Sequence, residues 1–208
     1  MGSKTDKDST STRVIVFDLG NVLLPFDWER SIQGLQKIDR GAAQRVERVV
    51  DSDVMLAYEK GSVSTGEFYR RAVEMLEVTI PLPEFKRLFS DIFTANDDLI
   101  ALLPHLCERY KLFLLSNTCE MHIEWIEKRF SLLHHFDELI LSHQVGHVKP
   151  EREIFDTVLA RSGLTPEKHF YVDDIFHYTE VAKGLGFQAH HFQSQGGLLK
   201  ELEVRGII

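Results

Sequence analysis

The chain has little cysteine, little positive charge and no long uninterrupted hydrophobic run. Its two cysteines, Cys107 and Cys119, lack the spacing of a metal site, so we expect two small buried thiols and a protein of the reducing cytoplasm. Lysine and arginine total 24 against 32 aspartates and glutamates, a formal net charge of -8, which argues against a nucleic-acid partner. Charges interrupt every apolar run before the roughly 18 to 20 residues that a membrane-spanning helix needs, so no membrane partner is expected.

The rest of the composition is that of a globular protein. Hydrophobic residues make up 43% of the 208 residues, enough for one α/β domain with a sizeable insert. Residues 1–12 are polar and rich in serine, threonine, lysine and aspartate, so we interpret them as a disordered leader. The ten histidines show no metal-ligand spacing, and we expect them at the surface or at strand ends.

Short apolar runs typical of buried strands alternate with helical patterns over most of the chain. These runs occupy residues 14–17, 112–115, 139–141, 170–172 and 187–191. Strands that alternate with helices favour a parallel sheet with right-handed crossovers and helices on both faces. The fold class predicted from this pattern is α/β, with a Rossmann-like, doubly wound parallel sheet.

One long segment departs from the alternation, because its apolar residues recur only at helical spacing. The segment spans residues 26–96 and follows the first predicted strand. Within it, Ser64 followed by Glu67 is a capping-box pattern that predicts the start of a helix. We therefore expect an all-helical insert at 26–96, with residues 13–25 and 97–208 forming the α/β core.

Polar residues follow four of the predicted strands, three of them directly and Lys149-Pro150 after a short connection from the run at 139–141. In chain order these groups are Asp18-Leu19-Gly20-Asn21, Ser116-Asn117, Lys149-Pro150 and Asp173-Asp174. Taken alone, each is ordinarily a turn, a helix cap or a solvated charge. In an open parallel sheet, however, ligands bind outside the carboxyl ends of the strands, so these groups are expected to converge on one crevice.

The order of these groups resembles the haloacid dehalogenase-like hydrolase superfamily. The similarity runs from about Arg13 to the C-terminus and is strongest to small phosphatases whose first motif reads Asp-Leu-Gly-Asn-Val, such as bacterial sugar-1-phosphatases. It implies that residues 26–96 form a helical cap over the site. It also implies a Mg²⁺-dependent phosphatase that acts on a small phosphorylated metabolite, with a sugar phosphate favoured.

The resemblance assigns a catalytic and a metal-binding set. Asp18 is implied as the nucleophile that forms an aspartyl-phosphate, and Lys149 as the positive charge that pairs with Asp18 and with the phosphoryl oxygens. Magnesium is implied to lie between Asp18, the carbonyl of Gly20 and Asp174, with Asp173 direct or through water. A set of oxygen ligands of this kind suits a hard divalent cation.

The same resemblance implies a cradle for the phosphoryl group. The hydroxyl of Ser116, the side chain of Asn117 and Lys149 are expected to bind its oxygens. Backbone N–H groups around Gly20 and Asn21 are expected to complete the cradle, as turns between a strand and a helix often do.

Two positions depart from the family pattern. Typical members carry an acid–base aspartate two residues after the nucleophile, where this chain has Gly20. Asp27 is the best-placed substitute, although it can equally cap the helix that begins near Trp28, and both roles can coexist. The family often has asparagine where this chain has Tyr178, a place that supports the metal site, so weaker metal binding is expected.

Two other functions stay open at this point. A metal-free 2-haloacid dehalogenase also lacks the second aspartate, but an acidic pair such as Asp173-Asp174 is repulsive unless a cation or a proton lies between its members. A catalytically silent protein that binds partners through its cap is the second alternative. The sequence leaves open the physiological substrate, the choice between monomer and homodimer, and the geometry of the cap.

Overall fold

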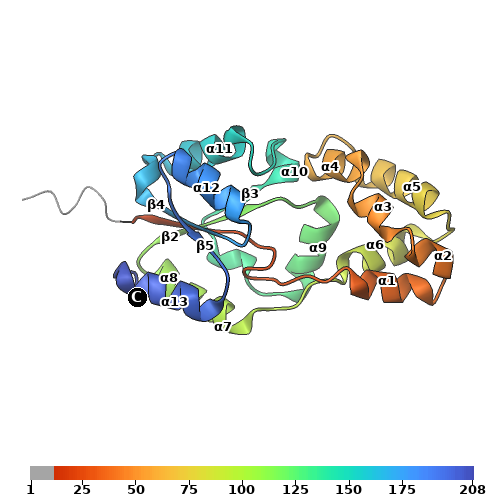
Figure 1. Ribbon diagram of the computed structural model, residues 1–208, viewed down its shortest axis with the longest axis horizontal. Helices are drawn as coiled ribbons and strands as arrows, with labels where there is room; N and C mark the ends of the chain where they lie inside the picture. Colours follow the sequence, from red (N-terminus) through yellow and green to blue (C-terminus); the bar gives the residue numbers. More distant parts are fainter. Residues whose placement is uncertain (1–11) are drawn as a thin grey trace, which may run out of the picture.

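A computed structural model describes residues 12–208, and its centre is a sheet of five parallel strands in the spatial order β3-β2-β1-β4-β5 (Figure 1). The strands are β1 (Val14–Phe17), β2 (Lys111–Ser116), β3 (Glu138–Leu141), β4 (His169–Asp173) and β5 (Gln188–His191). The chain builds outward from β1 to β3 and then returns to the other side of β1 with β4 and β5. This confirms the predicted doubly wound parallel sheet and places the reversal of strand order at β1.

Both faces of the sheet are covered by helices, which explains the nearly continuous apolar sequence of its central strands. Residues Ile15 and Phe17 of β1 pack on one face, and Val14 and Val16 pack on the other. The core helices are α7 (Asp97–Ile100), α8 (Leu103–Cys107), α9 (Glu120–Arg129), α10 (Ser142–Val145), α11 (Arg152–Ser162), α12 (Phe176–Gly184) and α13 (Gln195–Val204). Helices α8, α9 and α13 cover the first face, and α11 and α12 cover the second (Figure 1).

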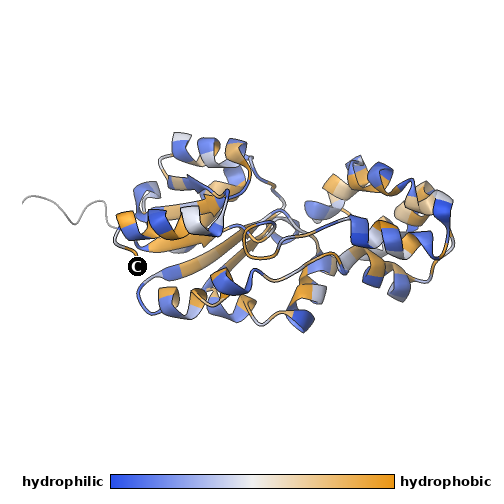
Figure 2. Cartoon of the chain, turned by 60° about the horizontal axis from the view of Figure 1, so that its bottom comes forward, coloured by the Kyte–Doolittle hydropathy of each residue, from blue (hydrophilic) through white to orange (hydrophobic). Residues whose placement is uncertain are grey.

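The segment between β1 and α7 is helical and contributes an apolar cluster of its own. Its helices are α1 (Glu29–Gln36), α2 (Arg40–Ala43), α3 (Val46–Val50), α4 (Asp53–Glu59), α5 (Thr65–Leu76) and α6 (Leu82–Ser90). Tyr58, Phe68, Phe85 and Phe89 lie at the centre of this cluster. Figure 2 shows the cap as a separate bundle beside the apolar strands of the core. The predicted all-helical cap after the first strand is confirmed as part of the fold, while its division at residues 26 and 96 stays a prediction.

The predicted helix start at Ser64 agrees with the structure. The Ser64 hydroxyl accepts a hydrogen bond from Glu67 N at 3.2 Å and caps α5. The sequence analysis did not predict α2 or α4. Helix α2 has only two apolar residues, and the apolar residues of α4 are consecutive from Val54 to Tyr58, so neither helix shows helical spacing.

Three further expectations can be compared with the described residues. The predicted leader lies outside them except for Thr12. Cys119 is buried as expected, but Cys107 is exposed on α8, so that expectation was wrong for Cys107: its side chain points away from the face that packs on the sheet. No helix among residues 12–208 is long and apolar enough to cross a bilayer.

We predict that Phe68→Ala lowers the free energy of unfolding by about 3 to 5 kcal/mol, because Phe68 is fully buried at the centre of the cap cluster and its loss leaves a cavity. Chemical denaturation followed by circular dichroism measures this change. Phe176→Ala is the matched control, since Phe176 is 58% exposed and its removal is expected to change stability by about 0.5 kcal/mol or less. Equal losses in the two variants would contradict the assignment of Phe68 to a cap core.

Candidate active site

Asp18 directly follows β1, at the carboxyl edge of the sheet. The turn after it places Asn21 in the left-handed region, with φ of 52°, which asparagine tolerates better than most residues. Asn21 Nδ2 donates a hydrogen bond to Asp174 Oδ2 at 3.1 Å. The first motif is thereby tied to the residue that follows β4, as the convergence of strand ends predicts.

Lys149 lies at the centre of the site and is almost fully buried. Its Nζ lies 2.7 Å from Asp18 Oδ1 and 2.7 Å from Asp173 Oδ2. The Asn117 side chain holds the backbone of Lys149 from both sides: Asn117 Oδ1 accepts from Lys149 N at 2.7 Å, and Asn117 Nδ2 donates to Lys149 O at 3.0 Å. Asn117, which follows β2, therefore helps to fix the Lys149 ammonium between the two carboxylates.

Asp173 is fully buried, and both of its carboxylate oxygens accept hydrogen bonds. Its Oδ2 accepts hydrogen bonds from Lys149 and from the hydroxyl of Tyr171, and its Oδ1 accepts from Ile175 N at 2.8 Å. Burial and the neighbouring carboxylates raise the pKa of Tyr171, which keeps its hydroxyl a donor. Asp173 therefore acts as a fixed negative charge that orients Lys149.

The electrostatics of the site are dominated by burial. Burial raises the pKa of Asp18 to about 7; Lys149 opposes this shift, and the nearby Asp173 and Asp174 add to it. Burial acts to lower the pKa of Lys149, but the attraction of Asp18 and Asp173 outweighs it and raises that pKa above its usual range. The pKa of half-exposed Asp174 is also raised, chiefly by burial. Three carboxyl groups thus lie near a single ammonium, which contacts two of them, Asp18 and Asp173.

The residues present fit a divalent cation. One carboxylate oxygen from each of Asp18, Asp173 and Asp174 lies within 4.8 Å of the others, and the set offers only oxygen atoms. The excess of negative charge around one ammonium is what a bound cation offsets. Asp18 and Asp174 are best placed for direct contact, because both oxygens of Asp173 already accept hydrogen bonds. The carbonyl of Gly20 accepts from Val22 N at 2.7 Å and keeps a second lone pair.

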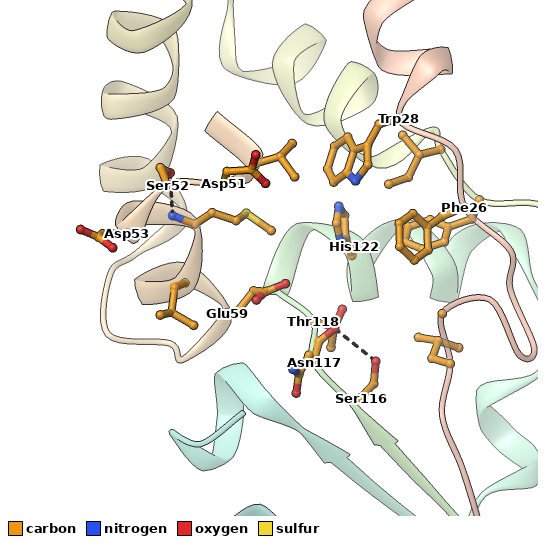
Figure 3. A pocket seen from close by; sticks show the side chains of 17 residues that line it. Phe26, Trp28, Asp51, Ser52, Asp53, Glu59, Ser116, Asn117, Thr118 and His122 are labelled. Atoms are coloured by element: carbon orange, nitrogen blue, oxygen red, sulfur yellow. Dashed lines mark hydrogen bonds between the residues drawn. The ribbon is translucent and has the colours of Figure 1, made fainter. Parts of the chain in front are cut away.

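Two adjoining cavities lie beside these groups. The larger has a volume of about 400 Å³ and lies between the cap and the core; its wall includes Trp28, Met55, Ser116 and His122 (Figure 3). The smaller, of about 240 Å³, contains the charged groups of the site. Its lining includes Asp18, Asn21, Lys149, Asp174 and Tyr178. Gly20, Phe26, Glu59 and Asn117 line both cavities.

The predicted phosphate-binding side chains differ in whether their polar atoms are already hydrogen-bonded within the protein. Ser116 ends β2 at the wall of the larger cavity, and among residues 12–208 its hydroxyl makes only a long 3.4 Å contact with the Asn117 carbonyl. The side-chain amide of Asn117 is occupied by the backbone of Lys149. The geometry therefore gives Asn117 a role in positioning the ammonium, and leaves the Ser116 hydroxyl available to a ligand.

The structure also places Asp27, the expected substitute for the aspartate missing at Gly20, and Tyr178, the second departure from the family pattern. The carboxylate of Asp27 accepts a hydrogen bond from Glu29 N at 2.9 Å, as the capping alternative expects, and Asp27 lines neither cavity. The ring of Tyr178 lies over the ammonium of Lys149, with 5.4 Å between Nζ and the ring centroid. Tyr178 thus contacts the positive charge of the site.

Three site residues were missed by the sequence analysis. Tyr171 was treated only as a strand residue, and Glu59 lies on the unpredicted helix α4. His122 was expected at the surface or at a strand end, which is wrong: it is buried on α9, stacked on Phe89 with 4.7 Å between ring centroids. Burial lowers the pKa of His122 to about 4, so the ring is neutral at pH 7. The N-cap Ser52 is the local signal from which α4 could have been found.

Comparison with known proteins finds a matching family model and related phosphatases. The family model described as haloacid dehalogenase-like hydrolase matches residues 65–191. A D-ribitol-5-phosphate phosphatase of Bacteroides thetaiotaomicron is 29% identical over 191 residues, covering 88% of this chain and 92% of that protein. A phosphorylated carbohydrates phosphatase of Thermotoga maritima is 30% identical over 125 residues, covering 56% of this chain and 58% of that protein.

Solved structures show the same relationship in three dimensions. A haloacid dehalogenase family enzyme from Bacteroides thetaiotaomicron, in complex with magnesium and inorganic phosphate, superposes with a TM-score of 0.81 at 29% identity, covering 89% of this chain and 96% of that chain. The L-2-haloacid dehalogenase of Xanthobacter autotrophicus has a TM-score of 0.64 at 18% identity, covering 95% of this chain and 84% of that chain, and shares the fold.

The resemblance inferred from the four strand-end motifs is thus confirmed over most of the chain. The family match begins in the cap and ends with β5, so it includes three of the four motifs, and the fourth, at Asp18, directly follows the central strand of the same sheet. The chain belongs to the haloacid dehalogenase-like hydrolase family.

Proposed function

We propose that the protein is a Mg²⁺-dependent phosphatase that hydrolyses a small phosphorylated metabolite through an aspartyl-phosphate on Asp18. The observation that carries this proposal is the buried centre in which Lys149 joins Asp18 and Asp173, with Asp174 beside them at a cavity wall. A sugar phosphate is favoured as substrate, because the relatives in Bacteroides thetaiotaomicron and Thermotoga maritima are named for phosphorylated sugars and sugar alcohols.

Asp18 supplies the nucleophile in this proposal. Its Oδ1 is held by the Lys149 ammonium, which leaves Oδ2 to attack the phosphorus atom. The new bond joins Asp18 Oδ2 to phosphorus, and the bond between phosphorus and the leaving oxygen breaks. Water then attacks the same phosphorus, the bond to Asp18 breaks, and inorganic phosphate and the free carboxylate are formed.

The remaining charged groups bind and orient the substrate. Lys149 presents a compact positive charge to the phosphoryl oxygens, and Asp173 keeps that charge in place. Asp18, Asp174 and the carbonyl of Gly20 would hold the magnesium ion. When bound, the ion reduces the repulsion between the Asp18 carboxylate and an anionic substrate. The Ser116 hydroxyl and backbone N–H groups around Gly20 would donate hydrogen bonds to the other phosphoryl oxygens, whereas the N–H of Asn21 already donates to Leu24 O at 3.2 Å.

The cavity geometry supports a small substrate. A volume of about 400 Å³ is within the usual range for small-molecule sites, and the cap forms one wall of it. Enclosure between cap and core excludes water from much of the leaving group, which strengthens the electrostatic interactions of the site.

A panel of phosphorylated sugars and sugar alcohols, assayed for phosphate release with Mg²⁺ and with EDTA, tests the proposed function. We expect release with Mg²⁺ and none with EDTA. Release of chloride from 2-chloropropionate in EDTA would instead identify a dehalogenase. No turnover of either class with Mg²⁺ would contradict the proposal and favour a silent binding protein.

Asp18→Asn is expected to lower turnover by about 10³-fold or more, because the amide is close in size to the carboxylate but is not a competent nucleophile. Steady-state assay of phosphate release measures the loss, and circular dichroism checks that the fold is retained. Residual activity within tenfold of the wild type would remove Asp18 from the mechanism.

Asp174→Ala is expected to raise the Mg²⁺ concentration for half-maximal activity by at least about tenfold, since it deletes an oxygen ligand of a cation with few protein contacts. A Mg²⁺ titration of the initial rate measures the shift. The control is Asp156→Ala on the exposed surface of α11, where the same substitution removes only an ion pair with Arg152. An unchanged titration for Asp174→Ala would show that the metal assignment is wrong.

A further inference from the structure

The site has no side-chain acid where the family ordinarily carries one. Gly20 occupies that position, and the ring of Phe26 fills the space beside it: a Cβ built on Gly20 would lie 3.0 Å from Phe26 Cε1. That distance is tighter than ordinary van der Waals contact, so a side chain at this position would require the Phe26 ring to shift by a few tenths of an ångström. Leaving-group protonation, if the chain provides it, has to come from another element.

Glu59 is the one glutamate that lines both cavities. It is the last residue of α4, and it shares the smaller cavity with Asp18 and Lys149. Figure 3 shows its side chain reaching from the cap toward Asn117 and Thr118 at the end of β2. Its carboxyl group is thus presented to the space between the cap and the strand ends, where a substrate's leaving group would lie.

The cap segment around Glu59 is fixed to the core on both sides. Before it, the hydroxyl of Tyr58 accepts a hydrogen bond from Met121 N at 3.2 Å. After it, Lys60 Nζ forms an ion pair with Glu151. Gly61 follows with a φ of 66°, so close to the core that an added Cβ would lie 2.0 Å from the His143 carbonyl oxygen. These contacts set the position of Glu59 relative to the nucleophile.

The carboxyl group of Glu59 has no structural task of its own. Within residues 12–208 it forms no hydrogen bond and no ion pair. Burial raises the pKa of Glu59 to about 6, and the distant charge of Lys149 opposes that shift. A carboxyl group in this state exchanges its proton near neutral pH, as an acid–base group must.

We propose that Glu59 is the catalytic acid–base residue of this active site, replacing from the cap the aspartate that the first motif lacks. The inference rests on the proposed phosphatase function. As the bond from phosphorus to the leaving oxygen breaks, protonated Glu59 gives its proton to that oxygen. As water attacks the aspartyl-phosphate, the ionised Glu59 takes a proton from the water, and the cycle returns to its starting state.

The test compares two phosphate esters in the wild type and in Glu59→Gln. One ester is 4-nitrophenyl phosphate, whose phenolate leaves without protonation, and the other is a primary alkyl phosphate that the wild type hydrolyses. The quantity compared is kcat/KM, because it reports the steps up to formation of the aspartyl-phosphate and not its hydrolysis. Glu47→Gln is the matched control, since Glu47 is exposed on cap helix α3 and lines neither cavity.

We expect Glu59→Gln to lower kcat/KM for the alkyl ester by about 10²- to 10⁴-fold and to leave that for 4-nitrophenyl phosphate within about threefold. Because the same residue serves the second step, the variant should also release a burst of one nitrophenolate per active site before a slow steady state. Glu47→Gln should match the wild type on both esters. Glu59→Asp, which keeps the acid one methylene shorter, should retain more alkyl-ester activity than Glu59→Gln.

Equal losses on both esters in kcat/KM, or no loss on either, would overturn the assignment of Glu59 while leaving the phosphatase proposal in place. A wild type that hydrolyses neither ester with Mg²⁺ would overturn the proposed function and this inference with it. Should Glu59→Gln fail to fold, the Glu59→Asp comparison alone decides, because a loss confined to the alkyl ester requires a proton donor at this position.

Discussion

The buried ammonium of Lys149, held 2.7 Å from carboxylate oxygens of both Asp18 and Asp173, is the interaction on which the site is organised. It joins the ends of β1 and β4 through side chains, while Asn117 at the end of β2 fixes its backbone. A buried ion pair is costly to form, and removing one partner leaves the others uncompensated. The sheet edge therefore keeps its geometry only while all of these strand ends are in register.

The fold was largely predictable because its sequence signals are local. The strand Val14–Phe17 is buried on both faces, so its sequence is a continuous apolar run. The start of α5 is predictable because Ser64 caps it through a hydrogen bond with Glu67, only three residues away. The site motifs were predictable for a related reason, since three of them lie directly at strand ends and the fourth, at Lys149, follows β3 after the short helix α10. Glu59 and His122 were not, because their roles come from packing between the cap and the core, which no local pattern encodes.

The cap and the core contribute different chemical groups to the walls of the two adjoining cavities. The core supplies the charged groups, arranged by backbone hydrogen bonds at strand ends. The cap supplies an aromatic wall that includes Trp28, together with three carboxyl groups, those of Asp51, Asp53 and Glu59. A sheet edge changes little without loss of the fold, whereas a helical insert with its own apolar cluster can vary more freely. This division is consistent with a family in which a shared core serves different substrates.

The ion pair between Lys60 and Glu151 connects the two halves more closely than its exposed position indicates. Glu151 precedes α11, and its other carboxylate oxygen accepts a hydrogen bond from Val148 N, one residue before the buried ammonium. Glu151, which binds the cap through Lys60, therefore also holds the loop that carries Lys149. In evolutionary terms, a substitution that removes the charge at position 60 would also remove a contact of Glu151, so we expect positions 60 and 151 to change together.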